Sequence, residues 1–324
     1  MKDDYAHLTW DDGHQGQFPL TQLAAYPNPL EQDMNNEHFR LSLRDNKHQV
    51  MWDRPTSGIT APFEYSDIIK ESGATKAFLA HYMKYGFAAI RNTPTSSGEE
   101  YPLIQVLKEL EIGPGWESKF GLVSRVEYSG AGATNQAFSN NRLELHTDLP
   151  YYPHMPAGYL FQCIDNTVSG GESVYVDSYA VAREMERDNN ELFRALCEIK
   201  VPFKNARGGW CMVSEVPIID LVEGNIERVR DIYFVRNYYE MALKWSSEKR
   251  EIWYEAHKEW RRLIDRPERH YLTCLSKGDL VLIDNSRVFH GRAAFDASGD
   301  GVRIMDAMYV EWSHIQNKLL KSEI

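Results

Sequence analysis

The sequence predicts a mainly β protein with flanking helices, whose core is an antiparallel sandwich or a jelly roll (double-stranded β-helix), together with a small β-rich N-terminal domain. Short strand-like runs separated by turn signals dominate the chain after residue 120. Only two long segments interrupt these runs with helical periodicity, and the first 55 residues carry their own hairpin signals. We therefore expect two domains, residues 1–55 and residues 56–324.

The N-terminal domain is expected to consist of short hairpins. "HLTWDDGHQGQFPL" alternates and turns at Asp12-Gly13, and "FRLSLRDNKHQVMW" turns around Asp45-Asn46. The segment 53–65 is rich in Pro, Gly, Ser and Thr, which makes it the best candidate for the linker.

A helix and a strand are expected to open the larger domain. In "SDIIKESGATKAFLAHYMKYG" the second half has helical periodicity, with Phe78, Leu79, Tyr82 and Met83 on one face. Gly86 then ends the helix, and "FAAIRN" follows as a short strand.

The jelly roll itself is expected to combine seven β runs with two helical stretches. The runs are "FGLVSRVEY", "NRLELH", "GYLFQCID", "GESVYVDS", "RDIYFV", "DLVLIDNSRVFHG" and "GVRIMDAMYVEW". The helical stretches are 178–199 and 246–267, and the chain ends in "EWSHIQNKLLKSEI", a candidate packing helix.

Charge and hydropathy exclude several partners. The formal net charge is -11 with a pI near 5.5, which argues against binding to nucleic acid or to an anionic membrane surface. No apolar run approaches the roughly 18–20 residues of a membrane span, and the N-terminus lacks a secretion signal. We expect a cytoplasmic protein whose four scattered cysteines are free thiols.

Polar residues at the ends of three β runs suggest a metal site. His146 and Asp148 end one run, His290 lies in "VFHGRAAF", and Arg303 opens another run thirteen residues later. Two imidazoles and one carboxylate form the facial triad of non-haem Fe(II) oxygenases, which leaves coordination positions open. A buried arginine could hold the distal carboxylate of a co-substrate through its bidentate fork. An HxD pair alone is also compatible with an ordinary turn histidine and a capping aspartate.

The wider sequence resembles one branch of the Fe(II)/2-oxoglutarate dioxygenases. "HTDLPYYPHMPAGYLFQCIDNTVSGGESVYVDSYAV", "GDLVLIDNSRVFHGRAAF" and "GVRIMDAMYVEW" are similar to the γ-butyrobetaine and trimethyllysine hydroxylases of the taurine-dioxygenase-like group. The resemblance covers about residues 66–316, and "LTWDDGHQGQFPLTQL" resembles the small N-terminal domain of the branch. It implies an enzyme that needs Fe(II), 2-oxoglutarate and O2 and that releases succinate and CO2.

The resemblance also implies roles for individual residues. His146, Asp148 and His290 correspond to the iron ligands, while Arg303 and Ser173 correspond to the residues that contact 2-oxoglutarate. Positions that correspond to substrate contacts, or that could replace them, are Asn135, Phe138, Leu149, Tyr151, Tyr309, Arg236 and Asn237. For Arg292, two residues after the distal histidine, we expect a solvated or ion-paired side chain.

Two departures from the branch bear on zinc and on the substrate. Residues 1–65 contain no cysteine, and the spacing of His14, His38 and His48 matches no zinc site, so we expect no zinc there. Leu149 stands where the resemblance leads us to expect an aromatic ring, and "FGLVSRVEYSG" lacks the tryptophan expected of a trimethylammonium cage.

We therefore expect oxidation of an unactivated C–H bond in a small polar metabolite, an amino acid or a derivative. The expected outcome is hydroxylation, with desaturation or ring closure as variants. The alternative is a quaternary ammonium substrate of the γ-butyrobetaine, trimethyllysine or trimethylaminophosphonate type. A metal-binding jelly roll without oxygenase activity and a non-catalytic binding module rank lower. The branch also suggests a homodimer.

Overall fold

The chain divides into two compact units, Met1–His48 and Gln49–Ile324. The computed structural model describes residues 5–11, 13–20, 49–96, 98, 100–128, 136–207, 209–222, 224–231, 245–298 and 300–321. In the smaller unit, β1 (Tyr5–Thr9) and β2 (Gln15–Pro19) pair antiparallel, as predicted for the first hairpin. Most of the second predicted hairpin lies outside the described residues.

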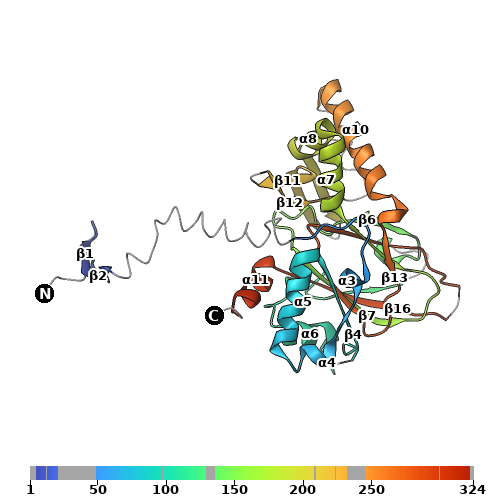
Figure 1. The fold of residues 1–324 in the computed structure, drawn as a ribbon, viewed down its shortest axis with the longest axis horizontal. Coiled ribbons are helices and arrows are strands. Elements are labelled where there is room, and N and C mark those ends of the chain that lie inside the picture. The colour runs from blue at the N-terminus through green and yellow to red at the C-terminus, as the bar shows by residue number, and fades with distance from the viewer. Residues whose placement is uncertain are drawn as a thin grey trace. The chain divides into compact units, whose positions relative to one another are not determined.

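The larger sheet of the second unit has six strands in the order β3-β4-β14-β7-β16-β5 (Figure 1). Its strands are β3 (Phe63–Glu64), β4 (Phe87–Arg91), β5 (Ser124–Glu127), β7 (Gly158–Asn166), β14 (Leu280–Asp284) and β16 (Arg303–Val310). Every pairing is antiparallel except that between β3 and β4. The central strand β14 is buried along its whole length, which matches its run of aliphatic residues.

The smaller sheet has four strands in the order β13-β8-β15-β6. They are β6 (Leu143–His146), β8 (Ser173–Asp177), β13 (Tyr271–Thr273) and β15 (Val288–Arg292), all antiparallel to their neighbours. The two sheets face each other, because the Tyr159 ring of β7 stacks on the His290 ring of β15 with centroids 5.0 Å apart. Two facing antiparallel sheets are the predicted jelly-roll core, and they remain open at their edges.

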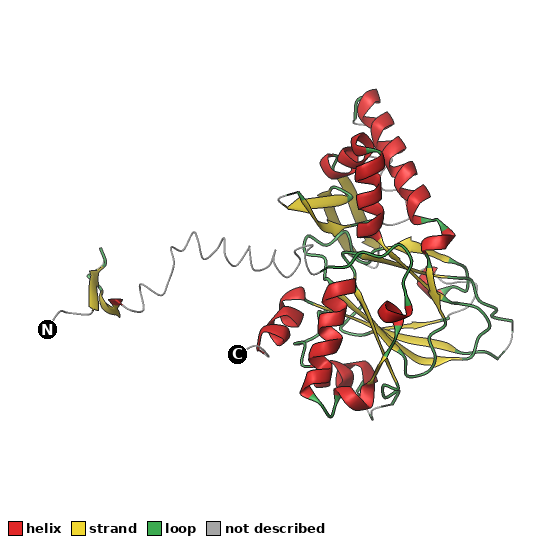
Figure 2. Ribbon diagram, in the orientation of Figure 1, coloured by secondary structure: helices red, strands yellow, loops and turns green. Residues whose placement is uncertain are grey.

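Helices cover the second unit in two groups (Figure 2). The first comprises α3 (Ser57–Thr60), α4 (Tyr65–Ile68), α5 (Ser72–Tyr85), α6 (Pro102–Leu110) and α11 (Trp312–Lys321), near the six-stranded sheet. The second comprises α7 (Ser178–Asp188), α8 (Asn190–Glu198) and α10 (Ser247–Ile264), which pack on one another. The predicted end of α5 is confirmed, since Gly86 caps the helix with φ +69°.

The predicted helix over 178–199 is two helices, because the helical backbone conformation is interrupted at Asn189. Asn189 has φ -150°, and its side-chain oxygen accepts a hydrogen bond from the backbone N–H of Leu192. It therefore ends α7 and caps α8 at the same residue. The prediction for 246–267 is confirmed by α10, whose Trp253 and Trp260 are fully buried.

The segment 53–65 is part of the folded unit and does not form the predicted linker. It contains α3, whose Ile59 is buried, and β3, which pairs in parallel with β4. Just before it, the indole N–H of Trp52 donates a hydrogen bond to the Tyr85 carbonyl at 2.9 Å. Pro, Gly, Ser and Thr in this segment serve turns and short elements of the core.

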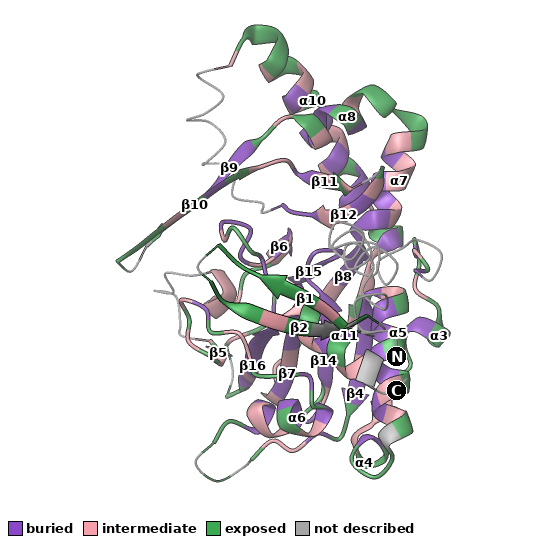
Figure 3. Ribbon diagram, turned by 90° about the vertical axis from the view of Figure 1, so that its left-hand side faces the viewer, coloured by how far each residue is buried: buried purple, intermediate pink, exposed green. Residues whose placement is uncertain are grey.

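Two hairpins that follow α8 were not predicted from the sequence. They pair β9 (Val201–Arg207) with β10 (Trp210–Val216) and β11 (Ile219–Val222) with β12 (Asn225–Val229). Figure 3 shows β9 and β10 extending as a long arm that is buried near its base and exposed toward its tip. Among the described residues, no helix is both long and apolar enough to cross a membrane.

Candidate metal centre

Strand pairing brings the three predicted ligands together. His146 is the last residue of β6, and the register of β15 against β6 places His290 directly opposite it. Asp148 follows two residues after His146. One ligand atom from each of the three residues lies within 4.8 Å of the others. The structure thus brings His290 together with His146 and Asp148, from which it is widely separated in the sequence.

The carboxylate of Asp148 lies between the two imidazoles. Its Oδ1 is 3.4 Å from His146 Nε2, and its Oδ2 is 3.5 Å from His290 Nε2. These separations are close to the roughly 3 Å between neighbouring ligands that each lie about 2.1 Å from one ion. His146 Nδ1 donates a hydrogen bond to the Glu144 carbonyl at 2.7 Å, so its Nε2 is the nitrogen that faces the cluster.

The electrostatics of the cluster keep one negative charge beside the two rings. Burial acts to raise the pKa of Asp148, but hydrogen bonds and charge interactions with His146 and His290 hold that pKa well below its usual range. Burial and the neighbouring His146 lower the pKa of His290. Burial also acts to lower the pKa of His146, but the hydrogen bond and charge interaction with Asp148 raise this pKa overall.

Two tyrosines of the larger sheet line the cluster. The Tyr309 hydroxyl donates a hydrogen bond to Asp148 Oδ2 at 2.8 Å. The Tyr159 ring lies between those of His290 and Tyr309, with centroid distances of 5.0 and 5.2 Å. Burial raises the pKa of Tyr309 well above its ordinary value, so its hydroxyl remains a donor. Tyr309 thus contacts the carboxylate directly, whereas the sequence predicted only a substrate contact.

Arg303 is a buried guanidinium without an acidic partner among the described residues. Only 5% of the residue is exposed, its Nε makes no hydrogen bond, and its guanidinium lies 5.8 Å from the Phe295 ring. Burial lowers the pKa of Arg303 overall, although the charge interactions with Cys163, Tyr159 and Tyr175 act to raise it. Since a buried cation is costly without a counter-charge, this residue is suited to binding an anion.

Ser173, the other predicted co-substrate contact, lies in the same region as Arg303. It is buried on β8, two residues before Tyr175, and Tyr175 interacts electrostatically with Arg303. Gly171 approaches the same arginine, because a Cβ at this position would lie 3.6 Å from Arg303 Nε. The glycine therefore leaves space beside the guanidinium, in addition to permitting a φ of +75°.

The predicted substrate contacts divide into three sets. Leu149 and Tyr151 are buried next to the cluster, and Tyr151 interacts with the Asp148 charge. Phe138 ends the short 3-10 turn Gln136–Phe138 and is half-buried, with no described ring contact to the cluster. The remaining predicted contacts, Asn135, Arg236 and Asn237, lie outside the described residues.

Arg292 corrects a prediction from the sequence. We expected a solvated or ion-paired side chain, but only 4% of the residue is exposed. Its guanidinium donates hydrogen bonds to the carbonyls of Ala137, Ser139 and Asn141 at 3.1, 2.7 and 2.6 Å. Arg292 therefore organises the loop that carries Phe138.

The sequence reading missed an aromatic group beside Tyr309. Trp116 lies next to it, with its backbone N–H donating to the Tyr309 carbonyl at 2.7 Å and the two rings 6.3 Å apart in an edge-on arrangement. The Trp116 ring also contacts Tyr152 at 4.9 Å. The resemblance leads us to expect the tryptophan of a trimethylammonium cage within "FGLVSRVEYSG". Trp116 lies four residues before that stretch.

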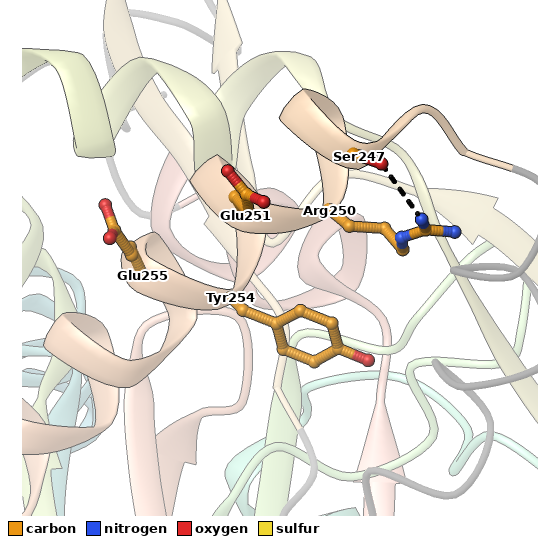
Figure 4. A pocket seen from close by; sticks show the side chains of 5 residues that line it. All are labelled: Ser247, Arg250, Glu251, Tyr254 and Glu255. Atoms are coloured by element: carbon orange, nitrogen blue, oxygen red, sulfur yellow. Dashed lines mark hydrogen bonds between the residues drawn. The ribbon is translucent and has the colours of Figure 1, made fainter.

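A hollow lies on the exposed side of α10 (Figure 4). It is lined by Ser247, Arg250, Glu251, Tyr254 and Glu255, which belong to a single helix. None of these residues is a member of the metal cluster or contacts Arg303 in the described structure. The chemistry described above is therefore concentrated between the two sheets.

The sequence matches the family described as "Taurine catabolism dioxygenase TauD, TfdA family" over residues 53–309. The chain belongs to this family. The match spans every element that contributes to the cluster, from β6 to Tyr309 of β16. It confirms the resemblance from the motifs and the prediction of a dioxygenase.

Curated relatives include γ-butyrobetaine and trimethyllysine dioxygenases. The chain is 27% identical to the γ-butyrobetaine dioxygenase of Pseudomonas sp. (strain AK-1), with 97% of this chain and 77% of the relative covered. The human γ-butyrobetaine dioxygenase is 24% identical, with 97% and 78% covered. The mitochondrial trimethyllysine dioxygenase of Bos taurus is 24% identical, with 89% and 66% covered.

Solved structures of similar fold include iron oxygenases of amino acids. One is the non-haem iron oxygenase OrfP in complex with Fe, succinate and (3S)-hydroxy-L-Arg. Its TM-score is 0.56 and its sequence identity is 15%, with 76% of this chain and 84% of the other covered. Another is an asparagine oxygenase in complex with Fe(II), 2S,3S-3-hydroxyasparagine and succinate, with a TM-score of 0.52 and 16% identity over 76% and 88%. They confirm the jelly-roll fold class.

Proposed function

We propose that the chain is an Fe(II)/2-oxoglutarate-dependent dioxygenase that oxidises an unactivated C–H bond of a small polar metabolite. One observation carries this proposal. A His–Asp–His cluster lies in the same sheet interior as Arg303, a buried guanidinium without an acidic partner among the described residues. The cluster suits a divalent iron, and the arginine suits the distal carboxylate of the co-substrate.

The donor set fits the iron and its co-substrate. Two nitrogens and one carboxylate leave coordination positions for the two-oxygen chelate of a 2-oxo acid and for O2. A hydrolytic zinc site has no need for a second, buried anion site at Arg303. Phe295 and Tyr175 adjoin this arginine, so a carboxylate bound there is shielded from water and its ion pair with the guanidinium is strengthened.

The protein's part in the reaction is to bind, orient and exclude water. When bound, the iron and 2-oxoglutarate supply the oxidising chemistry, with succinate and CO2 as products. His146, Asp148 and His290 would hold the metal, and Arg303 and Ser173 would fix the co-substrate at its far end. The Tyr309 hydroxyl holds one oxygen of Asp148, which restrains rotation of the carboxylate.

Two substrate classes are supported. We propose an amino acid or an amino-acid derivative, which is consistent with the structural likeness to an iron oxygenase solved with (3S)-hydroxy-L-Arg and to an asparagine oxygenase. The second candidate is a quaternary ammonium compound, which is consistent with the sequence relatives. A specific observation favours this second candidate, because Trp116, Tyr152 and Tyr309 form a contiguous aromatic group beside Asp148, and aromatic faces attract cations.

An anaerobic titration tests the proposal. Adding Fe(II) and then 2-oxoglutarate to the full-length protein should produce the weak visible charge-transfer band of a chelated 2-oxo acid. His146→Ala should lack this band. Absence of the band in the unmodified chain, or its persistence in His146→Ala, would refute the proposal. Succinate release with amino acids and with trimethylammonium compounds then separates the two substrate classes.

Three further expectations stay predictions. We propose a cytoplasmic location, a homodimer, and substrate contacts at Asn135, Arg236 and Asn237 that follow the family resemblance. The division into a small N-terminal domain and a catalytic domain also awaits a direct measurement. Light scattering after size-exclusion chromatography measures the oligomeric state. Limited proteolysis with sequencing of the fragments measures the position of the boundary.

A further inference from the structure

The backbone of Asp148 is gripped by a buried side chain from a distant part of the chain. Asn285, 137 residues further on, accepts a hydrogen bond from the Asp148 N–H through its Oδ1 at 2.8 Å. Its Nδ2 donates to the Asp148 carbonyl at 2.9 Å and to the Pro156 carbonyl at 3.2 Å. One carboxamide thus satisfies both backbone polar groups of the aspartate in the metal cluster.

Asp148 needs this support because its own strand has ended. β6 stops at His146, so the next residues have no partner in the sheet for their buried N–H and C=O groups. Asn285 is fully buried, and its own backbone N–H donates to the Ala157 carbonyl at 2.6 Å. The carboxamide is therefore presented from a fixed backbone and replaces the missing strand.

The residue after Asp148 makes the support more important. Leu149 is buried with φ +58°, in the left-handed region that a non-glycine residue occupies at a cost of about 1–2 kcal/mol. Its carbonyl accepts a hydrogen bond from the Tyr152 N–H at 3.0 Å, so the chain turns immediately after the carboxylate. A strained turn at this position persists only when its surroundings fix it.

On the other side, Thr147 is anchored to a buried backbone segment. Its N–H donates to the Asp231 carbonyl at 2.9 Å, and its Oγ1 accepts from the Asp231 N–H at 3.1 Å. This anchor fixes the peptide between His146 and Thr147, and Asn285 fixes the peptides on both sides of Asp148. Of the two supports, Asn285 is the one in which a single side chain holds the ligand residue itself.

We propose that Asn285 is a positioning residue for the metal centre, which sets the peptide of Asp148 so that its carboxylate faces both imidazoles before a metal binds. This inference rests on the proposed function, because it assumes that the cluster binds a divalent metal. Asn285 touches the backbone of Asp148, so its effect is on the direction of the carboxylate. Groups that orient metal ligands in this way typically contribute about 10- to 100-fold to metal affinity.

A matched pair of variants tests the proposal. Asn285→Leu removes the carboxamide and keeps the branched shape of the side chain, although leucine is larger than asparagine. Gln162→Leu is the control, because Gln162 is also fully buried and donates two hydrogen bonds, to Thr93 Oγ1 at 2.9 Å and to the Pro94 carbonyl at 2.8 Å. Co(II) is added to the metal-free full-length proteins, and its dissociation constant, its visible spectrum and the thermal midpoint are measured.

Asn285→Leu should bind Co(II) at least about 10-fold more weakly than the unmodified chain and with an altered visible spectrum. Gln162→Leu should lose comparable thermal stability, with Co(II) affinity within about two-fold. Equal affinities in Asn285→Leu and the unmodified chain would overturn the inference, and so would equal weakening in the control. Failure of the unmodified chain to bind Co(II) would instead refute the proposed function.

A measurement on the unmodified chain covers the case in which Asn285→Leu does not fold. The proposal requires that the Asp148 N–H is already bonded in the metal-free protein, so its hydrogen exchange should be slow with or without Co(II). Rapid exchange that becomes slow only after Co(II) is added would show that the metal, and not Asn285, orders this peptide.

Discussion

Two buried arginines of the second unit have opposite surroundings. Arg287 forms a two-pronged ion pair with Asp177 at 3.1 and 2.7 Å and also donates to the carbonyls of Val50 and Lys84. Arg303 is buried to a similar degree, yet it has no ion pair among the described residues and its Nε is unbonded. Both arginines are buried, so burial does not distinguish them. The presence of ion-pair and hydrogen-bond partners marks Arg287 as structural, and their absence among the described residues makes Arg303 suited to binding a ligand.

The largest effect is expected from breaking the satisfied pair. Arg287→Met leaves the Asp177 carboxylate buried without its counter-charge, which should lower the free energy of unfolding by about 3–5 kcal/mol. Denaturation in urea measures the change. The fraction of the Arg287→Met variant that is folded should bind 2-oxoglutarate as tightly as the unmodified chain. A loss below about 1 kcal/mol would contradict the structural role of Arg287.

Removing the unpaired arginine should affect binding instead of stability. Arg303→Met should weaken 2-oxoglutarate binding by about 1.5–3 kcal/mol, or roughly 10- to 150-fold, because a charge-assisted hydrogen-bonded pair is lost. The free energy of unfolding should be unchanged or higher, and Co(II) affinity should stay within about two-fold. Calorimetric titration gives both affinities. Equal losses of co-substrate and metal would mean that Arg303 only supports the fold.

Arg292 provides the smallest expected effect and sharpens the contrast. Its three bonds to the carbonyls of the 137–141 loop resemble the contacts of a structural arginine, although it lies close to Arg303. Arg292→Met should lower the free energy of unfolding by about 1–3 kcal/mol, because buried carbonyls lose their donor. The 2-oxoglutarate dissociation constant should change by less than about two-fold. A loss of affinity as large as in Arg303→Met would place Arg292 in the co-substrate site.

The sequence predicted the sheets and the metal cluster because both depend on local patterns. Strand runs such as that of β14 are apolar along their length, and polar residues at strand ends indicated His146 and Asp148. His290 was included because it also lies at the end of a β run, and the structure shows it opposite His146 in the pairing of β15 with β6. Arg303 was indicated by its place at the start of another β run, and the family resemblance gave its role. No sequence pattern could reveal that it has no acidic partner among the described residues.

The features that were missed depend on tertiary contacts. Arg292 is satisfied by carbonyl groups, which every residue has, so its partners leave no trace in the sequence. Trp116 reaches Tyr309 through an irregular segment whose path has no periodicity. Asn285 also gave no signal, because a side chain that replaces a strand partner looks in sequence like any turn asparagine.

The pairing of β15 also makes metal binding a measure of correct folding. This strand is bonded on both sides, with His290 opposite His146 on β6 and Tyr175 on β8. Because side chains alternate along a strand, a slip of one residue would turn His290 to the other face of the sheet and remove it from the cluster. During refolding, chelation would thus appear only in chains whose central strand has found its native partners.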